Sequence, residues 1–130
     1  MSDPFRLDGK RAVVTGAGKG IGRGISLQLA RAGADLVISS RTQEDLDSLA
    51  IEIEALGRQA TKVIVDVTNT VEVENLAAQA VAGGGIDVWV NNAGGLPDAT
   101  PRYLTRTPED RWDAQLDLNL KAVFIACQVA

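Results

Sequence analysis

The chain has 130 residues, of which 45% are hydrophobic and 23% are charged, as expected for one globular domain with its own core. Thirteen basic and seventeen acidic residues give a formal net charge of -4, so no global basic surface is available for nucleic acid or anionic lipid. The absence of histidine excludes Ser-His-Asp and Cys-His catalysis and most zinc chemistry, and we predict no metal site.

Cysteine content and hydropathy indicate the compartment. The single cysteine, Cys127, cannot form an intrachain disulfide, and no apolar run reaches the length of about 18 residues that a membrane span requires. We therefore predict a cytoplasmic protein without a membrane partner.

Short β-branched runs alternate with amphipathic segments along the chain. The runs predict buried strands at residues 11–15, 35–39, 61–67 and 86–90. Apolar residues at helical spacing predict four helices: residues 21–32, the segment between the caps Thr42 and Gly57, residues 71–81, and a last helix from Thr107 through Phe124. Thr42 with Asp45 resembles a capping box, and Thr107-Pro108 pairs an N-cap residue with proline at the first helical position.

This order predicts the fold class. Strictly alternating strands and helices with near-continuous apolar strands favour an α/β fold, a Rossmann-type doubly wound parallel sheet with helices on both faces. We predict a single domain over residues 1–130 with strand order 3-2-1-4. The ligand crevice is expected beyond the first and fourth strands, where the order reverses.

The turn after the first predicted strand is rich in glycine, with five glycines in nine positions from Gly16 to Gly24. An ordinary flexible loop is the alternative, but a turn here points backbone N–H groups and a helix N-terminus at an anion such as a pyrophosphate. The spacing matches neither GxGxxG nor a P-loop; it matches TGxxxGxG. In that pattern Gly16 makes the turn, Gly20 permits close phosphate approach and Gly22 brings the helix close to the sheet. We predict cofactor contacts from this turn at Gly16, Gly18, Lys19, Gly20, Ile21 and Gly22.

The end of the second predicted strand indicates which dinucleotide binds. A site for NAD normally offers an acid for the ribose 2′-hydroxyl here, whereas this chain has Ser39-Ser40-Arg41. The guanidinium of Arg41, with Lys19 from the glycine turn, suits a 2′-phosphate, so we predict NADP(H) in preference to NAD(H). The alternative is that both are solvated surface cations.

Three motifs follow successive predicted strands. TGxxxGxG begins at Thr15, an Asp-Val pair stands at residues 66–67 and NNAG at residues 91–94. Together they strongly resemble the short-chain dehydrogenase/reductase family. The resemblance spans essentially all 130 residues but only the N-terminal portion of a family member, so we expect the C-terminal part of the fold to be missing.

The resemblance implies an oxidoreductase that transfers hydride between a nicotinamide and a small carbonyl or alcohol substrate. It implies adenine contacts from the Asp-Val pair, backbone beside the cofactor at residues 92–94, and a loop braced by Asn91. The cofactor-binding positions it adds are Asp66, Val67, Asn92, Ala93 and Gly94. A turn or helix cap at Asp66 and an asparagine-rich turn at residues 91–92 are the structural alternatives.

Catalytic residues are only partly present. The segment DLNLKAVF matches the family and places Asn119 at the asparagine of an Asn-Ser-Tyr-Lys group, although a mid-helix amide can equally bond a neighbouring carbonyl. The serine and the Tyr-x-x-x-Lys pair are not found, since the only tyrosine, Tyr103, has Thr107 four residues on and stays unassigned. We expect either the front part of a longer enzyme or a truncated, non-catalytic nucleotide-binding or scaffold protein.

Two further expectations concern other classes and partners. A methyltransferase also has a glycine-rich turn, but the acids expected before the glycines and after the second strand are missing.

The last helix becomes almost wholly apolar from Ala122 onward, and the fourth strand forms a sheet edge, so we expect a homo-oligomer.

Overall fold

The computed structural model describes residues 3–130 and contains one parallel sheet. Its strands are β1 (Arg11–Val14), β2 (Asp35–Ser40), β3 (Ala60–Ile64) and β4 (Val88–Val90). Their order is β3-β2-β1-β4 and every neighbouring pair is parallel, which confirms the predicted topology. The order reverses between β1 and β4, so a crevice is available at their carboxyl ends.

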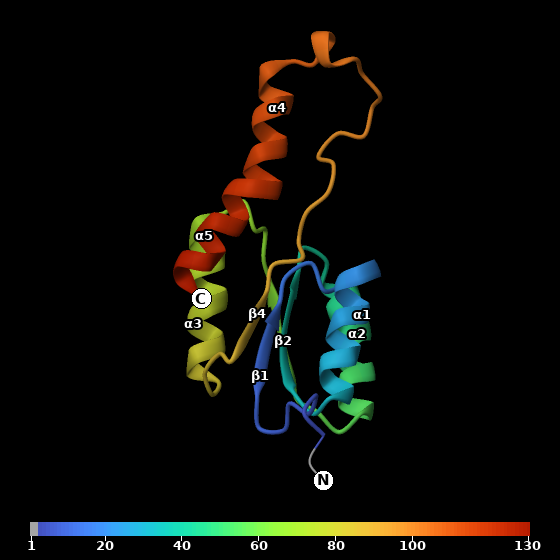
Figure 1. The fold of residues 1–130 in the computed structure, drawn as a ribbon, viewed down its shortest axis with the longest axis vertical. Helices are drawn as coiled ribbons and strands as arrows, with labels where there is room; N and C mark the ends of the chain where they lie inside the picture. Colours follow the sequence, from blue (N-terminus) through green and yellow to red (C-terminus); the bar gives the residue numbers. More distant parts are fainter. Residues whose placement is uncertain (1–2) are drawn as a thin grey trace.

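Helices cover both faces of this sheet (Figure 1). The helices are α1 (Gly20–Arg31), α2 (Gln43–Ala55), α3 (Thr70–Ala82), α4 (Glu109–Leu116) and α5 (Ala122–Val129), with a 3-10 turn η1 (Leu104–Arg106) and a π-helical segment η2 (Asp117–Lys121) joining α4 to α5. In Figure 1, α1 and α2 lie on one face, and α3 and α5 on the other. Helix α4 and the loop after β4 project beyond the carboxyl ends of the strands.

The core has two layers because successive strand residues point to opposite faces. On the α1/α2 side, Val14 and Ile38 pack with Leu49 of α2, and all three are fully buried. On the α3/α5 side, Val13 and Val37 pack with residues of α3 and α5. Burial on both faces explains why these strands are continuous apolar runs rather than alternating ones.

Some predicted boundaries are wrong by one to a few residues. Strand β3 ends at Ile64, short of the predicted Val67, because the chain turns where Thr68 donates two hydrogen bonds to Asp66. Helix α4 takes Pro108 rather than Thr107 as its N-cap, and the Thr107 hydroxyl donates to the Tyr103 carbonyl instead.

The predicted capping box at the start of α2 is also wrong in its bonding. Thr42 does stand at the N-cap position, but its side chain makes no cap hydrogen bond. The Thr42 backbone N–H instead donates to the hydroxyl of Ser40 at 3.1 Å, so the bond that shapes this entry comes from the end of β2.

Candidate functional site

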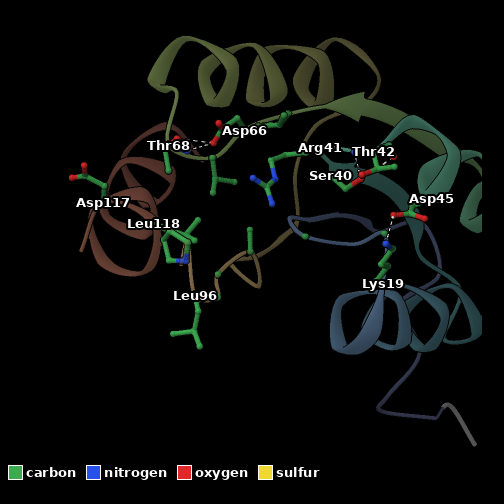
Figure 2. Close-up of a pocket in the computed structure, with 18 of the residues that line it drawn as sticks. Lys19, Ser40, Arg41, Thr42, Asp45, Asp66, Thr68, Leu96, Asp117 and Leu118 are labelled. Atoms are coloured by element: carbon green, nitrogen blue, oxygen red, sulfur yellow. Dashed lines mark hydrogen bonds and ion pairs between the residues drawn. The ribbon is translucent and has the colours of Figure 1, made fainter. Parts of the chain in front are cut away.

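A cleft of about 720 Å³ opens at the carboxyl ends of the strands, the size of a small-molecule site. Figure 2 shows residues of the glycine turn, the end of β2, the turn after β3 and the start of η2 converging on it. Of the predicted cofactor-binding residues, eight line this cleft: Gly16, Gly18, Lys19, Arg41, Asp66, Val67, Ala93 and Gly94. Gly20, Ile21, Gly22, Asn92 and the predicted catalytic Asn119 are not among its lining residues.

Gly16 and Gly22 of the glycine turn pack too closely against neighbouring chain to accept side chains. Gly16 has φ +60, and a Cβ there would lie 2.8 Å from the Cα of Ala93. A Cβ on Gly22 would overlap the Gly16 carbonyl oxygen and the side-chain amide of Asn92. Gly22 therefore brings α1 against the turn itself and against Asn92.

Thr15, to which the sequence analysis gives no role of its own, connects the glycine turn to the NNAG segment. Its side chain is almost completely buried, and its hydroxyl oxygen accepts hydrogen bonds from the backbone N–H groups of Asn92 and Ala93, both at 3.1 Å. Asn92 Nδ2 in turn donates to the Gly16 carbonyl at 3.0 Å. These three bonds fix the two glycine-containing loops relative to each other. The threonine that begins the TGxxxGxG motif is the feature of the sequence from which this role could have been predicted.

The two cations predicted to select NADP(H) have different surroundings. Arg41 extends into the middle of the cleft (Figure 2), and within residues 3–130 it makes no hydrogen bond or ion pair. Lys19 is 81% exposed, and its Nζ lies 3.6 Å from Asp45 Oδ2, the carboxylate of a residue in the first turn of α2. A positively charged group is therefore available at the end of β2, where an NAD site has an acid.

Asp66 shapes a turn, which is the structural alternative given for it, and it also lines the cleft. One carboxylate oxygen accepts hydrogen bonds from the Thr68 hydroxyl at 2.6 Å and the Thr68 N–H at 2.9 Å, so the residue does shape a turn. These bonds, with a smaller contribution from the charge of Arg41, hold the pKa of Asp66 below its ordinary value. Asp66 lines the cleft even though it accepts both hydrogen bonds from Thr68.

Asn119 lies in the π-helical segment, a distortion that is frequent at functional sites. Its Oδ1 accepts from the Gly95 N–H at 2.9 Å, and its Nδ2 donates to the Gly95 carbonyl at 2.8 Å and the Gln115 carbonyl at 3.1 Å. The amide thus ties the helix to the loop after β4, and its catalytic role stays a prediction.

Asn91 connects the end of β4 to α5. Its Oδ1 accepts from Trp89 Nε1 at 3.0 Å, and its Nδ2 lies 3.4 Å from the Cys127 sulfur. Both contacts support the bracing position implied for Asn91.

Arg23 was missed by sequence analysis. Its guanidinium donates to the Gly18 carbonyl at 3.3 Å, bonds Ser48 at 3.0 Å and pairs with Glu52, so it fastens the glycine turn to α2. The α2 partners are 25 and 29 residues away in sequence, and no local pattern signals such contacts.

Neither a metal-binding cluster nor a membrane-spanning helix is present among residues 3–130. Among residues 3–130, no group of three or more His, Cys, Asp or Glu side chains could hold a metal ion. No helix in that range has the length and apolar character needed to cross a membrane.

The parallel sheet, its reversal of strand order and the glycine turn at that reversal define a Rossmann-type doubly wound fold. The profile of the short chain dehydrogenase family matches residues 10–130. The chain therefore belongs to the short-chain dehydrogenase/reductase family of oxidoreductases.

Individual relatives agree with this membership. An uncharacterized oxidoreductase of Mycobacterium tuberculosis is 46% identical over 113 residues, which is 86% of this chain and 42% of that protein. The 3-oxoacyl-[acyl-carrier-protein] reductase of Thermotoga maritima is 38% identical over 126 residues, 96% of this chain and 50% of that enzyme. A short chain dehydrogenase from Burkholderia cenocepacia, solved in complex with NADP, superimposes with a TM-score of 0.88 at 41% identity, covering 96% of this chain and 51% of that one. The chain thus spans about half the length of the relatives it matches.

Proposed function

We propose that residues 1–130 form a single NAD(P)-binding unit that holds NADP(H) for hydride transfer between the nicotinamide and a carbonyl or alcohol substrate. The observation that carries this proposal is the convergence of eight predicted cofactor-binding residues on one cleft at the switch point of the sheet. Ligands of doubly wound sheets bind at this place.

The glycine turn fits the pyrophosphate of a dinucleotide. No side chain caps the start of α1 and no acidic residue stands in its first turn, so the positive end of the helix has no competing anion there. A Cβ built on Gly20, whose φ is +55, would meet nothing within 4 Å, so there is space beside this backbone. When bound, the nicotinamide supplies or accepts the hydride, and the chain contributes binding and orientation.

Charge at the end of β2 supports NADP(H) over NAD(H). Arg41 reaches into the cleft without a partner among residues 3–130, and the chain has Ser39-Ser40 where NAD sites carry an acid. A guanidinium can donate two parallel hydrogen bonds to a phosphate, which makes it well suited to the 2′-phosphate. The NADP bound to the Burkholderia relative is consistent with the same choice here.

We expect proton transfer to require a Tyr-x-x-x-Lys pair in addition to Asn119. Asn119 is the position proposed to act in catalysis, through its place beside the loop that follows β4. The 130 residues contain no Tyr-x-x-x-Lys, so we expect no reduction of carbonyl substrates by this chain alone. Oxidation of NADPH by the purified chain in the presence of carbonyl compounds would contradict this expectation.

The cofactor proposal is tested by calorimetric titration of NADP+ and NAD+ into the wild type and Arg41→Asp. The variant should lose about 1–3 kcal/mol of binding free energy for NADP+ and much less for NAD+, because only NADP+ carries the 2′-phosphate. Arg102→Asp makes the same charge change in the exposed loop after β4 and should alter neither affinity appreciably. Equal losses for both cofactors in Arg41→Asp would remove the 2′-phosphate assignment.

A further inference from the structure

Asp45 is an acidic residue next to Lys19, one of the two cations proposed to bind the 2′-phosphate. It lies in the first turn of α2, lines the cleft and pairs with Lys19 at 3.6 Å (Figure 2). Among residues 3–130 its carboxylate accepts no hydrogen bond, so Lys19 is the partner that the structure gives it. One of the two selecting cations is therefore partly neutralised before any nucleotide arrives.

The carboxylate is held more firmly than the ammonium group. The Asp45 side chain is only 25% exposed, whereas that of Lys19 is 81% exposed. A Cβ built on Gly18 would lie 2.9 Å from the Asp45 Cβ, and Arg23 donates to the Asp45 carbonyl at 3.5 Å. Packing and backbone contact thus fix Asp45 at the edge of the cleft, while Lys19 is a long, flexible side chain that can leave it.

We propose that Asp45 is a specificity-determining residue that lowers the chain's selectivity for a 2′-phosphate by competing for Lys19. This inference rests on the proposed binding of NADP(H) in the cleft. A 2′-phosphate must take Lys19 away from Asp45 and then lie near a carboxylate of like charge. A 2′-hydroxyl carries no charge, so its binding does not depend on Lys19 and is not opposed by Asp45.

The other acidic residue beside a selecting cation does not have this role. Asp66 faces Arg41, but one of its carboxylate oxygens is already engaged by the N–H and hydroxyl of Thr68. The Asp45 carboxylate, by contrast, is paired with Lys19, one of the two selecting cations, and accepts no hydrogen bond among residues 3–130.

The test compares two nucleotides that differ only in the phosphate of interest, adenosine 2′,5′-bisphosphate and adenosine 5′-monophosphate, titrated into the wild type and Asp45→Asn. The substitution removes the charge and keeps the shape. It should raise affinity for the bisphosphate about two- to fivefold, the range for an exposed ion pair, and leave the monophosphate within experimental error. The gain should shrink as salt is raised from low to physiological concentration.

Asp47→Asn is the matched control. Asp47 lies on the same helix and pairs with Lys62 at 2.7 Å, but it is not a lining residue of the cleft. The net charge of the chain changes by the same amount in both variants. An equal gain in Asp47→Asn would assign the effect to overall charge and overturn the proposal.

A double-mutant cycle with Lys19→Met tests whether Asp45 acts through Lys19. The gain from Asp45→Asn should largely disappear in the Lys19→Met background. A loss of bisphosphate affinity in Asp45→Asn, an equal change for both nucleotides, or no change while the wild type binds the bisphosphate would overturn this inference alone. Failure of the wild type to bind either nucleotide would overturn the proposed function together with this inference.

Discussion

The glycine-turn region and the arm formed by α4, η2 and α5 are held together in different ways. In the first, Thr15 and Gly16 bond Asn92 and Ala93 across more than 75 residues of sequence, and the participating groups are buried or half-buried. In the arm, one helical side carries four exposed apolar residues at intervals of four: Trp112 (54% exposed), Leu116 (40%), Leu120 (64%) and Phe124 (59%).

Helix α5 packs Ala126 into the apolar core beside α3, whereas hydrogen bonds hold α4 and η2 to the adjacent loop. Arg111 donates to the Thr100 carbonyl at 2.5 Å, and Asn119 bonds Gly95, so α4 and η2 hold the adjacent loop. The polar groups of the glycine turn thus find their hydrogen-bond partners within this chain, whereas the apolar side of the arm stays exposed. Substitutions in the two regions should therefore have different consequences.

The largest effect on stability is expected from Gly22→Ala. The added methyl group meets the Gly16 carbonyl and the Asn92 amide, neither of which can move without breaking the bond between them, so we expect a loss of about 3 kcal/mol, the upper end of the overpacking range. Urea denaturation measures it. Gly24→Ala, two residues along α1 with nothing within 4 Å of its Cβ, is the control and should stabilise the helix by about 0.5–1 kcal/mol. Similar losses in both variants would show that the close approach at Gly22 is not the cause.

Thr15→Val should cost about 1–3 kcal/mol, because the backbone N–H groups of Asn92 and Ala93 lose their acceptor in a largely buried position. Thr15→Ser keeps the oxygen and should lose clearly less. Denaturation midpoints of the three proteins provide the comparison, and a valine variant as stable as the serine variant would argue against the hydroxyl as the connecting group.

In the arm, Leu120→Glu with Phe124→Glu should change association rather than folding. We propose that the exposed apolar side of the arm is covered in a homo-oligomer, so light scattering at micromolar concentration should show species larger than a monomer. The double variant should shift the distribution towards the monomer, with unfolding free energy changed by less than about 0.5 kcal/mol per site. Val71→Glu, at a 71% exposed position on α3, is the control. A monodisperse wild-type monomer would refute this proposal.

The smallest effect concerns acid stability at Asp66. Its pKa in the folded chain lies below the ordinary value of 3.8, so the unfolded chain binds more protons and the stabilisation is complete only above that value. The contribution is lost as pH falls through the lowered pKa. Asp66→Asn should therefore lose less stability than the wild type between about pH 6 and about pH 3. Parallel pH profiles would show that the Thr68 bonds do not stabilise the ionised carboxylate.

Sequence patterns are sufficient to predict the strands and their order because the features that determine them are local in the sequence. Apolar strands such as Arg11–Val14 and β2 are covered on both sides, and alternation with amphipathic helices leaves few parallel topologies. The predicted ends of the helices are less accurate where a side chain forms a different hydrogen bond from the one expected. The Thr107 hydroxyl, for example, donates to the Tyr103 carbonyl instead of capping α4.

The site was predicted where motifs are contiguous and missed where contacts are long-range. Gly16, Asp66 and Gly94 belong to motifs that follow strands, and they do line the cleft. Arg23 and Asp45 act on the glycine turn from helices that pack together only in the folded chain, so their spacing in the sequence carries no signal.

The most direct test of the dinucleotide cleft is titration of the ¹⁵N-labelled chain with NADP+, followed by amide chemical shifts. We expect the perturbed amides to be those of the cleft lining at Arg41, residues 66–67 and residues 93–94, together with the glycine turn at residues 16–22. The apolar groove between the N-terminal segment and α1, which includes Leu7 and Ile25, should stay unaffected. Absent perturbations, or perturbations confined to that groove, would contradict binding of the dinucleotide in the cleft.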